Sequence, residues 1–138
     1  MKGEFKCEII ISYKALEDEP KPDKIFETKK PEFIIPPNKD EDPFSLVKDL
    51  TKKYTRKSVC IFLPGTRFDK HGTRHGRGGG WYDRFLSRAP KEWIRIGVAN
   101  ETQFTSKKLE RKEWDEPVDY VIIVGENDTE IIKTNSRT

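Results

Sequence analysis

The chain of 138 residues is long enough for one hydrophobic core and short for two domains, so we expect a single domain. Hydrophobic residues make up 33% and charged residues 37% of the chain, but the apolar residues gather in short runs, which is typical of a folded protein with long polar connections. A net charge of +3 is too small to indicate a nucleic-acid partner by itself.

The two cysteines, Cys7 and Cys60, do not form a recognisable zinc motif, because no C-x-x-C or Cys/His spacing accompanies them. Cys60 lies inside an apolar run, and we expect it to pack in the core. The sequence contains no signal-peptide pattern and no run approaching the roughly 20 apolar residues of a membrane span. These features predict a soluble protein of the cytoplasm.

The amino-terminal third of the chain predicts a strand, a long connection and a helix. Residues 4–13 contain an isoleucine run typical of a strand, which we place near a sheet edge. Residues 16–42 contain five prolines, which disfavour regular structure, although the apolar segment 32–37 is expected to pack against the core. Asp42 then predicts a helix N-cap for residues 43–54, with proline at the first helical position.

The remainder of the chain alternates between apolar runs and a further helical segment. We predict strands at 58–63, 93–99 and 117–124, a helix at 81–88 and a polar segment at 105–111. This order predicts an α/β fold, a single three-layer domain with a mainly parallel sheet, over residues 1–125. Residues 126–138 are polar, and we expect them to form a mobile tail.

The segment from Phe68 to Asp83 is the strongest functional feature of the sequence. It contains five of the nine glycines, both histidines and three aromatic residues, together with the arginines Arg74 and Arg77. Glycines allow backbone N–H groups to turn toward a ligand, and guanidinium groups match phosphate or carboxylate oxygens. Because it follows a predicted buried strand, this segment is expected at the carboxyl ends of the parallel strands, where ligands bind in such sheets. The pattern predicts an anion-binding loop.

Standard nucleotide-binding motifs do not explain this loop. No Gly-Lys-Ser/Thr sequence occurs, so the loop is not a P-loop, and a dinucleotide fingerprint starting at Gly76 would need a third glycine where Trp81 stands. A single Arg-Gly-Gly sequence at Arg77 leaves RNA binding through Arg74, Arg77, Trp81 and Tyr82 as a weaker alternative.

The loop and its surroundings resemble the 5-formyltetrahydrofolate cyclo-ligase family, also called methenyltetrahydrofolate synthetase. The segment Gly76–Asp83, GRGGGWYD followed by RFL, is similar to the family signature. Further similar segments are LPG and FDKHG before the loop, GVA after it, EWD before the last predicted strand and PVDY at the start of that strand. The resemblance extends over about residues 58–124 and, more weakly, over 33–37.

This resemblance implies that ATP and Mg²⁺ are used to convert 5-formyltetrahydrofolate into 5,10-methenyltetrahydrofolate. It implies catalytic roles for Arg74, Arg77 and Tyr82, nucleotide binding by Arg74, Gly76, Arg77, Gly78, Gly79, Gly80, Trp81, Tyr82 and Asp83, folate binding by Phe33, Trp81 and Tyr82, and Mg²⁺ binding by Asp83 and Asp115. Arginines beside a transferring phosphoryl group would neutralise its charge, and Mg²⁺ prefers one or two carboxylates with phosphate oxygens and water.

The family has an amino-terminal helix with a lysine and an arginine that grip ATP phosphates, and a glutamate that contacts the pterin, and we expect this chain to lack both. A homodimer or a complementing chain would then complete the site. The alternative function is a nucleotide- or folate-binding protein or subunit that has lost the ligase chemistry.

Several of these residues also have a purely structural interpretation. Asp83 is a candidate helix cap, and Asp115 a turn residue. We expect His71 and His75 to be loop residues, Trp93 and Trp114 to pack in the core, and residues 17–19 to form a solvated charged face.

Overall fold

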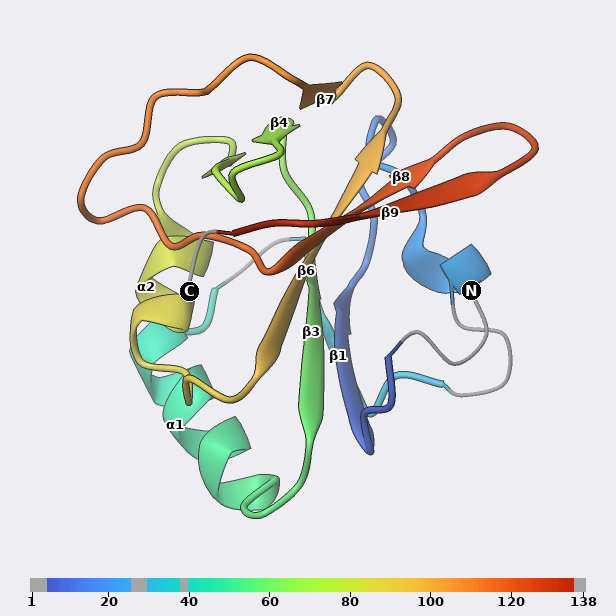
Figure 1. Ribbon diagram of the computed structural model, residues 1–138. Coiled ribbons are helices and arrows are strands. Elements are labelled where there is room, and N and C mark those ends of the chain that lie inside the picture. Colours follow the sequence, from blue (N-terminus) through green and yellow to red (C-terminus); the bar gives the residue numbers. More distant parts are fainter. Residues whose placement is uncertain (1–4, 26–29, 38–39, 136–138) are drawn as a thin grey trace.

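The centre of the fold is a six-stranded sheet, seen in a computed structural model that describes residues 5–25, 30–37 and 40–135 (Figure 1). Its strands lie in the order β2-β1-β3-β6-β8-β9, and all neighbours are parallel except β8 and β9. The bounds are Ile9–Tyr13 for β1, Phe33–Ile35 for β2, Val59–Leu63 for β3, Ile94–Asn100 for β6, Tyr120–Val124 for β8 and Thr129–Lys133 for β9. The predicted α/β fold with a mainly parallel sheet is confirmed.

Both faces of the sheet are covered at its centre, which explains the unbroken apolar run of β3. All five residues of β3 are buried. Ile61 and Leu63 pack in the cluster that contains the helices, whereas Cys60 and Phe62 pack in a second cluster on the opposite face. A strand buried on both faces needs apolar residues at every position. Each fully buried side chain of this size contributes about 1.5–3 kcal/mol to folding.

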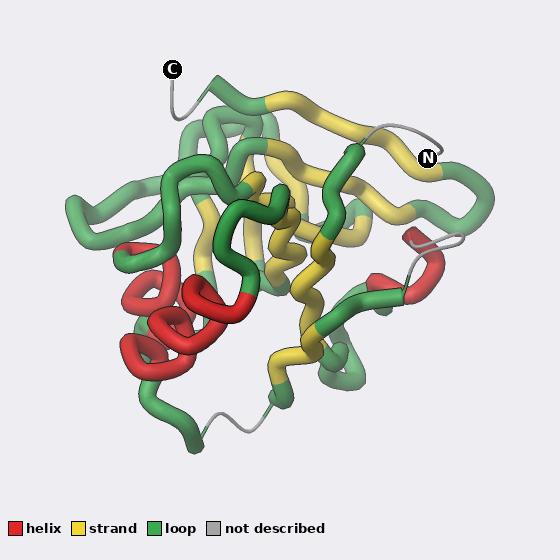
Figure 2. Tube along the Cα trace, turned by 90° about the horizontal axis from the view of Figure 1, so that it is seen from below, coloured by secondary structure: helices red, strands yellow, loops and turns green. Residues whose placement is uncertain are grey.

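Two α-helices, α1 (Pro43–Lys53) and α2 (Trp81–Ser87), lie together on one face of the sheet (Figures 1 and 2). The predicted start of α1 is confirmed, because the carboxylate of Asp42 accepts a 2.9 Å hydrogen bond from the backbone N–H of Ser45. A short 3₁₀ helix, η1 (Pro22–Ile25), lies on the other side, where Ile25 packs in the second cluster. In the described part of the chain, no helix is both long and apolar enough to cross a membrane.

A second, three-stranded sheet lies beyond the carboxyl end of β3, and the sequence did not predict it. It consists of β5 (Arg74–His75), β4 (Arg67–Asp69) and β7 (Phe104–Thr105) in that order. Its central side chain, Phe68, is fully buried in the helix-side core. Gly65 and Gly97 leave the space for this ring, because a Cβ atom at either position would press against it. The small sheet therefore fixes the segment that leads into the glycine-rich loop.

The prediction of a mobile tail after residue 125 is wrong for residues 129–133, which form β9. This strand pairs with β8 over five positions, and Ile131 and Ile132 pack on opposite faces of the sheet. Immediately after it, the buried hydroxyl of Thr134 donates a 2.7 Å hydrogen bond to the carbonyl of Val118. Two adjacent isoleucines were enough for an edge strand once a partner was present. Residues 136–138 lie outside the described residues.

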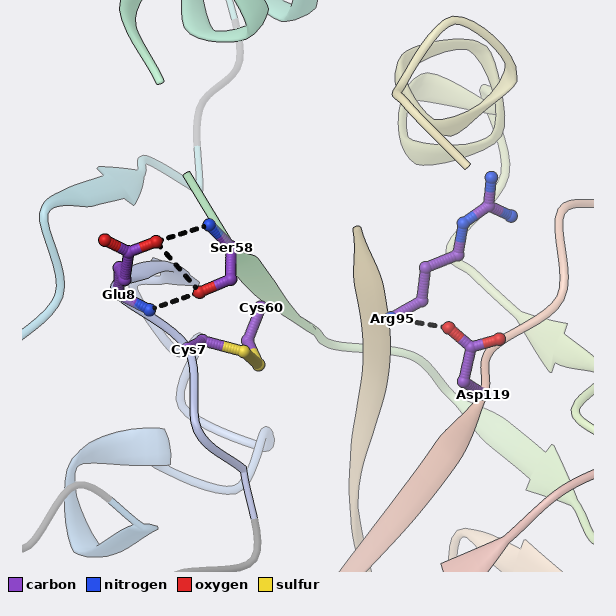
Figure 3. Close-up of a disulfide and its surroundings, with 6 residues drawn as sticks. All are labelled: Cys7, Glu8, Ser58, Cys60, Arg95 and Asp119. Carbon is purple, nitrogen blue, oxygen red and sulfur yellow. Dashed lines mark hydrogen bonds between the residues drawn. A yellow bond between two sulfur atoms is a disulfide. The ribbon is translucent and has the colours of Figure 1, made fainter. Parts of the chain in front are cut away.

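A disulfide joins Cys7 to Cys60 and connects the segment before β1 to β3 (Figure 3). Beside it, the backbone N–H of Glu8 donates to Oγ of Ser58 at 2.9 Å, and the N–H of Ser58 donates to the carboxylate of Glu8 at 3.0 Å. Cys60 is buried as predicted, but its pairing with Cys7 was not predicted. These contacts all lie toward the amino ends of the two strands.

Candidate active site

A pocket of about 880 Å³ lies at the carboxyl ends of β1, β2 and β3. Tyr13 and Ile35, the last residues of β1 and β2, line one part of it, and Pro64, which follows β3, lines another. The glycine-rich loop and α2 form another part of the wall, and Leu16, Glu19 and residues 114–116 also line the pocket. The expectation that this loop lies at the carboxyl ends of the parallel strands is therefore confirmed.

The pocket brings together most of the residues that the sequence suggested. These are Arg74, Gly76, Arg77, Gly78, Gly79, Gly80, Trp81, Tyr82, Asp83 and Asp115. Phe33 is not among the lining residues, and its side chain packs against the helix-side core. From the same strand, Ile35 and the two prolines after it reach the pocket instead.

Three consecutive glycines give the loop its backbone path. Gly78, Gly79 and Gly80 have φ angles of 93°, 75° and 67°, which are left-handed conformations that other residues adopt at a cost. A Cβ atom at Gly78 or Gly79 would meet nothing within 4 Å, so the conformation, and not crowding by the protein, requires glycine at these two positions. The loop leaves open space where a ligand can approach the backbone.

Arg74 is a buried cation in the wall of the pocket. Its Nε donates a 2.6 Å hydrogen bond to the carbonyl of Pro64, and its guanidinium lies 4.9 Å from the ring centre of Tyr82. Among the described residues, no carboxylate lies within ion-pair distance of it. Burial lowers the pKa of Arg74, and the charge of Asp83 acts in the opposite direction. An anion in the pocket would compensate this buried charge.

The terminal nitrogens of Arg74 lie close to the loop. A Cβ atom at Gly76 would stand 3.3 Å from both of them, so the absence of a side chain at Gly76 leaves room for the guanidinium. Burial also raises the pKa of Tyr82, and the nearby Arg74 opposes this effect. The Tyr82 phenol therefore stays protonated at neutral pH.

Arg77 is held by two acidic residues from the segment between β1 and η1. Its Nη2 lies 2.7 Å from the carboxylate of Asp18, and its Nε lies 3.3 Å from the carboxylate of Glu19. The hydrogen bond to Asp18 raises the pKa of Arg77 and lowers that of Asp18. Arg77 thus ties the glycine-rich loop to the segment between β1 and η1 in the wall of the pocket.

The prediction of a solvated acidic face at 17–19 is wrong for Glu19, whose side chain is only 5% exposed. Besides Arg77, the backbone N–H of Leu16 donates a 2.7 Å hydrogen bond to it, and Glu19 lines the pocket. Glu19 was not predicted as a site residue, because its partner Arg77 lies 58 residues away in the sequence. No local pattern marked it.

The two acidic residues suggested for Mg²⁺ line the same pocket from different elements. Asp83 accepts a 3.0 Å hydrogen bond from the backbone N–H of Glu116, and Asp115 accepts one of 2.8 Å from that of Lys112. Burial raises the pKa of Asp83, and the charge of Asp115 contributes in the same direction. The helix-cap interpretation of Asp83 is wrong, because Gly80 is the N-cap of α2 and makes no side-chain hydrogen bond.

These two carboxylates fit a magnesium ion that is shared with a phosphate ligand. The described residues contain no cluster of three or more His, Cys, Asp or Glu side chains that could hold a metal without help. Mg²⁺ commonly uses one or two carboxylates and takes its other ligands from substrate phosphates and water. A raised pKa is expected where a buried carboxylate lacks a cation.

The three tryptophans have different surroundings. Trp81 donates its indole N–H to the carbonyl of Glu41 at 3.0 Å, and its ring stacks on Phe85 with a centroid distance of 5.4 Å. Trp93 is buried in the core as predicted. The same prediction for Trp114 is wrong, because Trp114 is 63% exposed and lines the pocket.

Of the two histidines, His75 lines the pocket and His71 does not. His75, in β5, lines the pocket edge, and its Nε2 lies 2.7 Å from the carbonyl of Glu110. His71 is in the loop between β4 and β5, and its backbone N–H donates to the carboxylate of Asp69 at 2.9 Å. Both contacts stabilise the small sheet and its connections.

Comparisons with known proteins agree with one another. The profile of the 5-formyltetrahydrofolate cyclo-ligase family matches residues 42–124. Two curated proteins named 5-formyltetrahydrofolate cyclo-ligase are similar over 66 residues: that of Mycoplasma genitalium is 36% identical, and that of Haemophilus influenzae 41%. The matches cover 48% and 47% of this chain but only 39% and 34% of those proteins.

Two solved structures have the same fold. The 5,10-methenyltetrahydrofolate synthetase of Mycoplasma pneumoniae superposes with a TM-score of 0.53 and 21% identity, over 81% of this chain and 71% of that one. The enzyme of the same name from Aquifex aeolicus gives 0.56 and 22%, over 96% and 73%.

Proposed function

Because the chain belongs to the 5-formyltetrahydrofolate cyclo-ligase family, we propose that it carries out the ATP- and Mg²⁺-dependent conversion of 5-formyltetrahydrofolate to 5,10-methenyltetrahydrofolate. The observation that carries this proposal is Arg74, a buried cation with no ion-pair partner among the described residues, beside an open glycine loop at the end of a parallel sheet. ATP supplies the anion that this arrangement lacks. We place the protein in the cytoplasm as part of this proposal.

The triphosphate of ATP lies along the loop from Gly76 to Gly80 in this proposal. Backbone N–H groups of Gly78 and Gly79 approach it through the open space beside them. Arg74 neutralises the transferring phosphoryl group, and Arg77 leaves Asp18 to bind a neighbouring phosphate. The burial of Arg74 strengthens its attraction for the ligand, because the local dielectric constant is low.

Asp83 and Asp115 hold Mg²⁺ in this proposal. When bound, the ion would offset the negative charge of the ATP phosphates. The backbone N–H donors of Glu116 and Lys112 fix the two carboxylates in place for this role.

In this proposal the folate binds next to Trp81 and Tyr82 in the pocket wall. Phe33 packs against the helix-side core and does not line the pocket. Glu19 positions Arg77 at this wall, because its carboxylate accepts hydrogen bonds from the backbone N–H of Leu16 at 2.7 Å and from Nε of Arg77 at 3.3 Å. In the family, an amino-terminal helix also contacts the ATP phosphates. We propose that a second copy of this chain or another chain supplies those contacts.

The reaction has two steps. The formyl oxygen attacks the γ-phosphorus of ATP, the bond from phosphorus to the bridging oxygen breaks, and ADP leaves. The N10 nitrogen then attacks the formyl carbon, the carbon–oxygen bond breaks, and inorganic phosphate leaves with the formyl oxygen and takes up the proton that N10 loses. Arg74 and Arg77 stabilise the charge on the phosphoryl oxygens in both steps.

The test is an absorbance assay with protein, ATP, Mg²⁺ and 5-formyltetrahydrofolate, since methenyltetrahydrofolate absorbs in the near ultraviolet. We expect product only when ATP is present. We expect Arg74→Ala to weaken ATP binding at least about tenfold, because an interaction with a charged group is lost. Arg88→Ala is the matched control, since Arg88 lies at the end of α2 against Phe44.

Other outcomes have distinct meanings. An ATP-induced rise in melting temperature without any product at high protein concentration would identify a binding protein in place of the ligase. Equal ATP affinity of Arg74→Ala and the parent would overturn the role of the loop. Strongly salt-dependent RNA binding without ATP binding would favour the RNA alternative.

A further inference from the structure

The aromatic residue with the most accessible ring in the pocket is Trp114, which has no assigned role. Four aromatic residues line the pocket: Tyr13, Trp81, Tyr82 and Trp114. Tyr13 and Tyr82 are buried, and one face of Trp81 is covered by Phe85. Trp114, at 63%, is more exposed than any other large hydrophobic residue in the described part of the chain.

The backbone of Trp114 is fixed from both sides. Trp114 lies within a tight turn, which is closed by the N–H of Asp115 donating to the carbonyl of Lys112 at 3.1 Å and by the N–H of Lys112 donating to the carboxylate of Asp115 at 2.8 Å. After it, the N–H of Glu116 donates to Asp83 at 3.0 Å. The Glu116 carboxylate forms a 3.0 Å ion pair with the buried Arg95. The turn is thus anchored to α2 and to β6.

An exposed tryptophan on an anchored turn at a pocket is costly to keep without a ligand. Its large apolar surface stays in water, where burial would be favourable. A planar heteroaromatic ring stacked on it would bury that surface, and the fixed backbone lowers the ordering cost of such binding. Leu16, also partly exposed, lines the same pocket and adds apolar surface.

We propose that Trp114 is a specificity-determining residue that stacks on a heteroaromatic ring of the bound substrate, either the purine of ATP or the pterin of the folate. This inference rests on the proposed function. Trp81, the residue that the sequence suggested for stacking, has one ring face occupied by Phe85 and its N–H by Glu41. Trp114 offers the ring face that Trp81 lacks.

The test compares Trp114→Leu and Trp114→Phe with the parent in three binding titrations: ATP, 5-formyltetrahydrofolate, and inorganic tripolyphosphate, which has no ring. We expect Trp114→Leu to weaken the ligand whose ring it stacks on by about fivefold to a hundredfold, and Trp114→Phe to weaken it less. Tripolyphosphate affinity stays within twofold. Phe44→Leu is the control, because Phe44 is a partly exposed aromatic residue outside this pocket.

The three titrations distinguish stacking on the purine of ATP from stacking on the pterin of the folate. A loss confined to ATP assigns Trp114 to the purine, and a loss confined to the folate assigns it to the pterin. Unchanged affinity for both, or an equal loss for tripolyphosphate, overturns the proposal. Failure of the proposed function has a different signature, in which the parent protein itself forms no methenyltetrahydrofolate.

Discussion

The carboxylate of Asp18 accepts a 2.7 Å hydrogen bond from Nη2 of Arg77, across 59 residues of sequence. This contact connects an arginine of the glycine-rich loop to the segment that follows β1. The bond lies at the surface, where 41% of the Arg77 side chain and 69% of the Asp18 side chain are exposed. Exposed ion pairs contribute little free energy, so we expect a phosphate group to compete with Asp18 for the guanidinium of Arg77.

We therefore expect Asp18→Asn to tighten the binding of tripolyphosphate by about two- to fivefold, because Arg77 then has one charged partner, Glu19, in place of two. Titration calorimetry measures this change. Glu17→Gln removes an exposed neighbouring charge and serves as control. Since the hydrogen bond to Arg77 lowers the pKa of Asp18, Asp18 stays ionised, and the difference between parent and variant persists, down to a pH below the ordinary titration range of aspartate. Weaker binding by Asp18→Asn would mean that Asp18 positions Arg77 for the ligand.

Removing the carboxylate of Asp83 tests the magnesium site. We expect Asp83→Asn and Asp115→Asn each to raise the Mg²⁺ concentration needed for half-maximal ATP binding by about tenfold, since each loses one of two anionic ligands. Nucleotide fluorescence at a series of Mg²⁺ concentrations gives the value. Asp42→Asn is the matched control, because Asn replaces Asp well as the cap of α1. A Mg²⁺ requirement unchanged in both pocket variants would exclude this site.

Gly97→Ala tests the close packing around Phe68. The added Cβ atom would overlap the buried Phe68 ring, and we expect the free energy of unfolding in urea to fall by about 2–3 kcal/mol. The double variant with Phe68→Leu should lose less than the sum of the two single changes, because the smaller side chain makes room. Full additivity in this cycle contradicts the packing argument.

The hydroxyl of Tyr54 is buried and has no hydrogen-bond partner among the described residues. We expect Tyr54→Phe to raise the free energy of unfolding by about 0.5–1.5 kcal/mol, because a desolvated polar group is removed. Burial raises the pKa of Tyr54, and Glu32 adds to the effect. The unfolded phenol therefore ionises first above about pH 10, the parent loses stability there, and the advantage of Tyr54→Phe widens with pH.

Tyr13→Phe is the matched comparison, measured by urea denaturation over the same pH range. The Tyr13 hydroxyl donates a 2.7 Å hydrogen bond to the carbonyl of Pro20, so its removal should lower the free energy of unfolding by about 1 kcal/mol. The two tyrosine variants thus differ in sign. A loss of stability in both would point to a partner for the Tyr54 hydroxyl.

The disulfide predicts a redox-dependent stability. Its cysteines are 53 residues apart, and constraining a loop of this length in the unfolded chain is worth about 4 kcal/mol. We expect reductant to lower the urea midpoint of the parent and to leave the Cys7→Ala, Cys60→Ala double variant unchanged. ATP binding should be equal in both, because the bridge lies toward the amino ends of β1 and β3 and the pocket lies at their carboxyl ends. If reductant leaves the urea midpoint of the parent unchanged, the disulfide does not contribute to the free energy of unfolding.

Local signals in the sequence predicted most of the central sheet and both α-helices. Asp42 before Pro43 marked the start of α1, and the apolar run at 59–63 marked a strand covered on both faces. The small sheet escaped prediction because its strands have only two or three residues. Strands that short show no alternation, and their pairing depends on contacts between distant segments.

The sequence predicted the part of the candidate site formed by the glycine-rich loop. It did not predict that Glu19 and Trp114 line the same pocket. Glycine and arginine residues close together in sequence also lie close together in space, so Arg74 and the loop were found. Glu19 lay in a run of acidic residues and seemed solvated, but a partner far along the chain buries it. Trp114 was expected in the core because tryptophan usually is, and the turn that holds it depends on contacts to α2 and β6.

The two edges of the main sheet determine how the molecule behaves toward its own copies. At one edge β2 has three residues, and Pro31, Pro36 and Pro37 beside it have no N–H group to donate to an incoming strand. At the other edge β9 exposes Glu130 and Lys133. Short, proline-flanked and charged edges oppose strand addition. The protein is thereby protected from edge-to-edge aggregation at the high concentrations that binding and calorimetric experiments require.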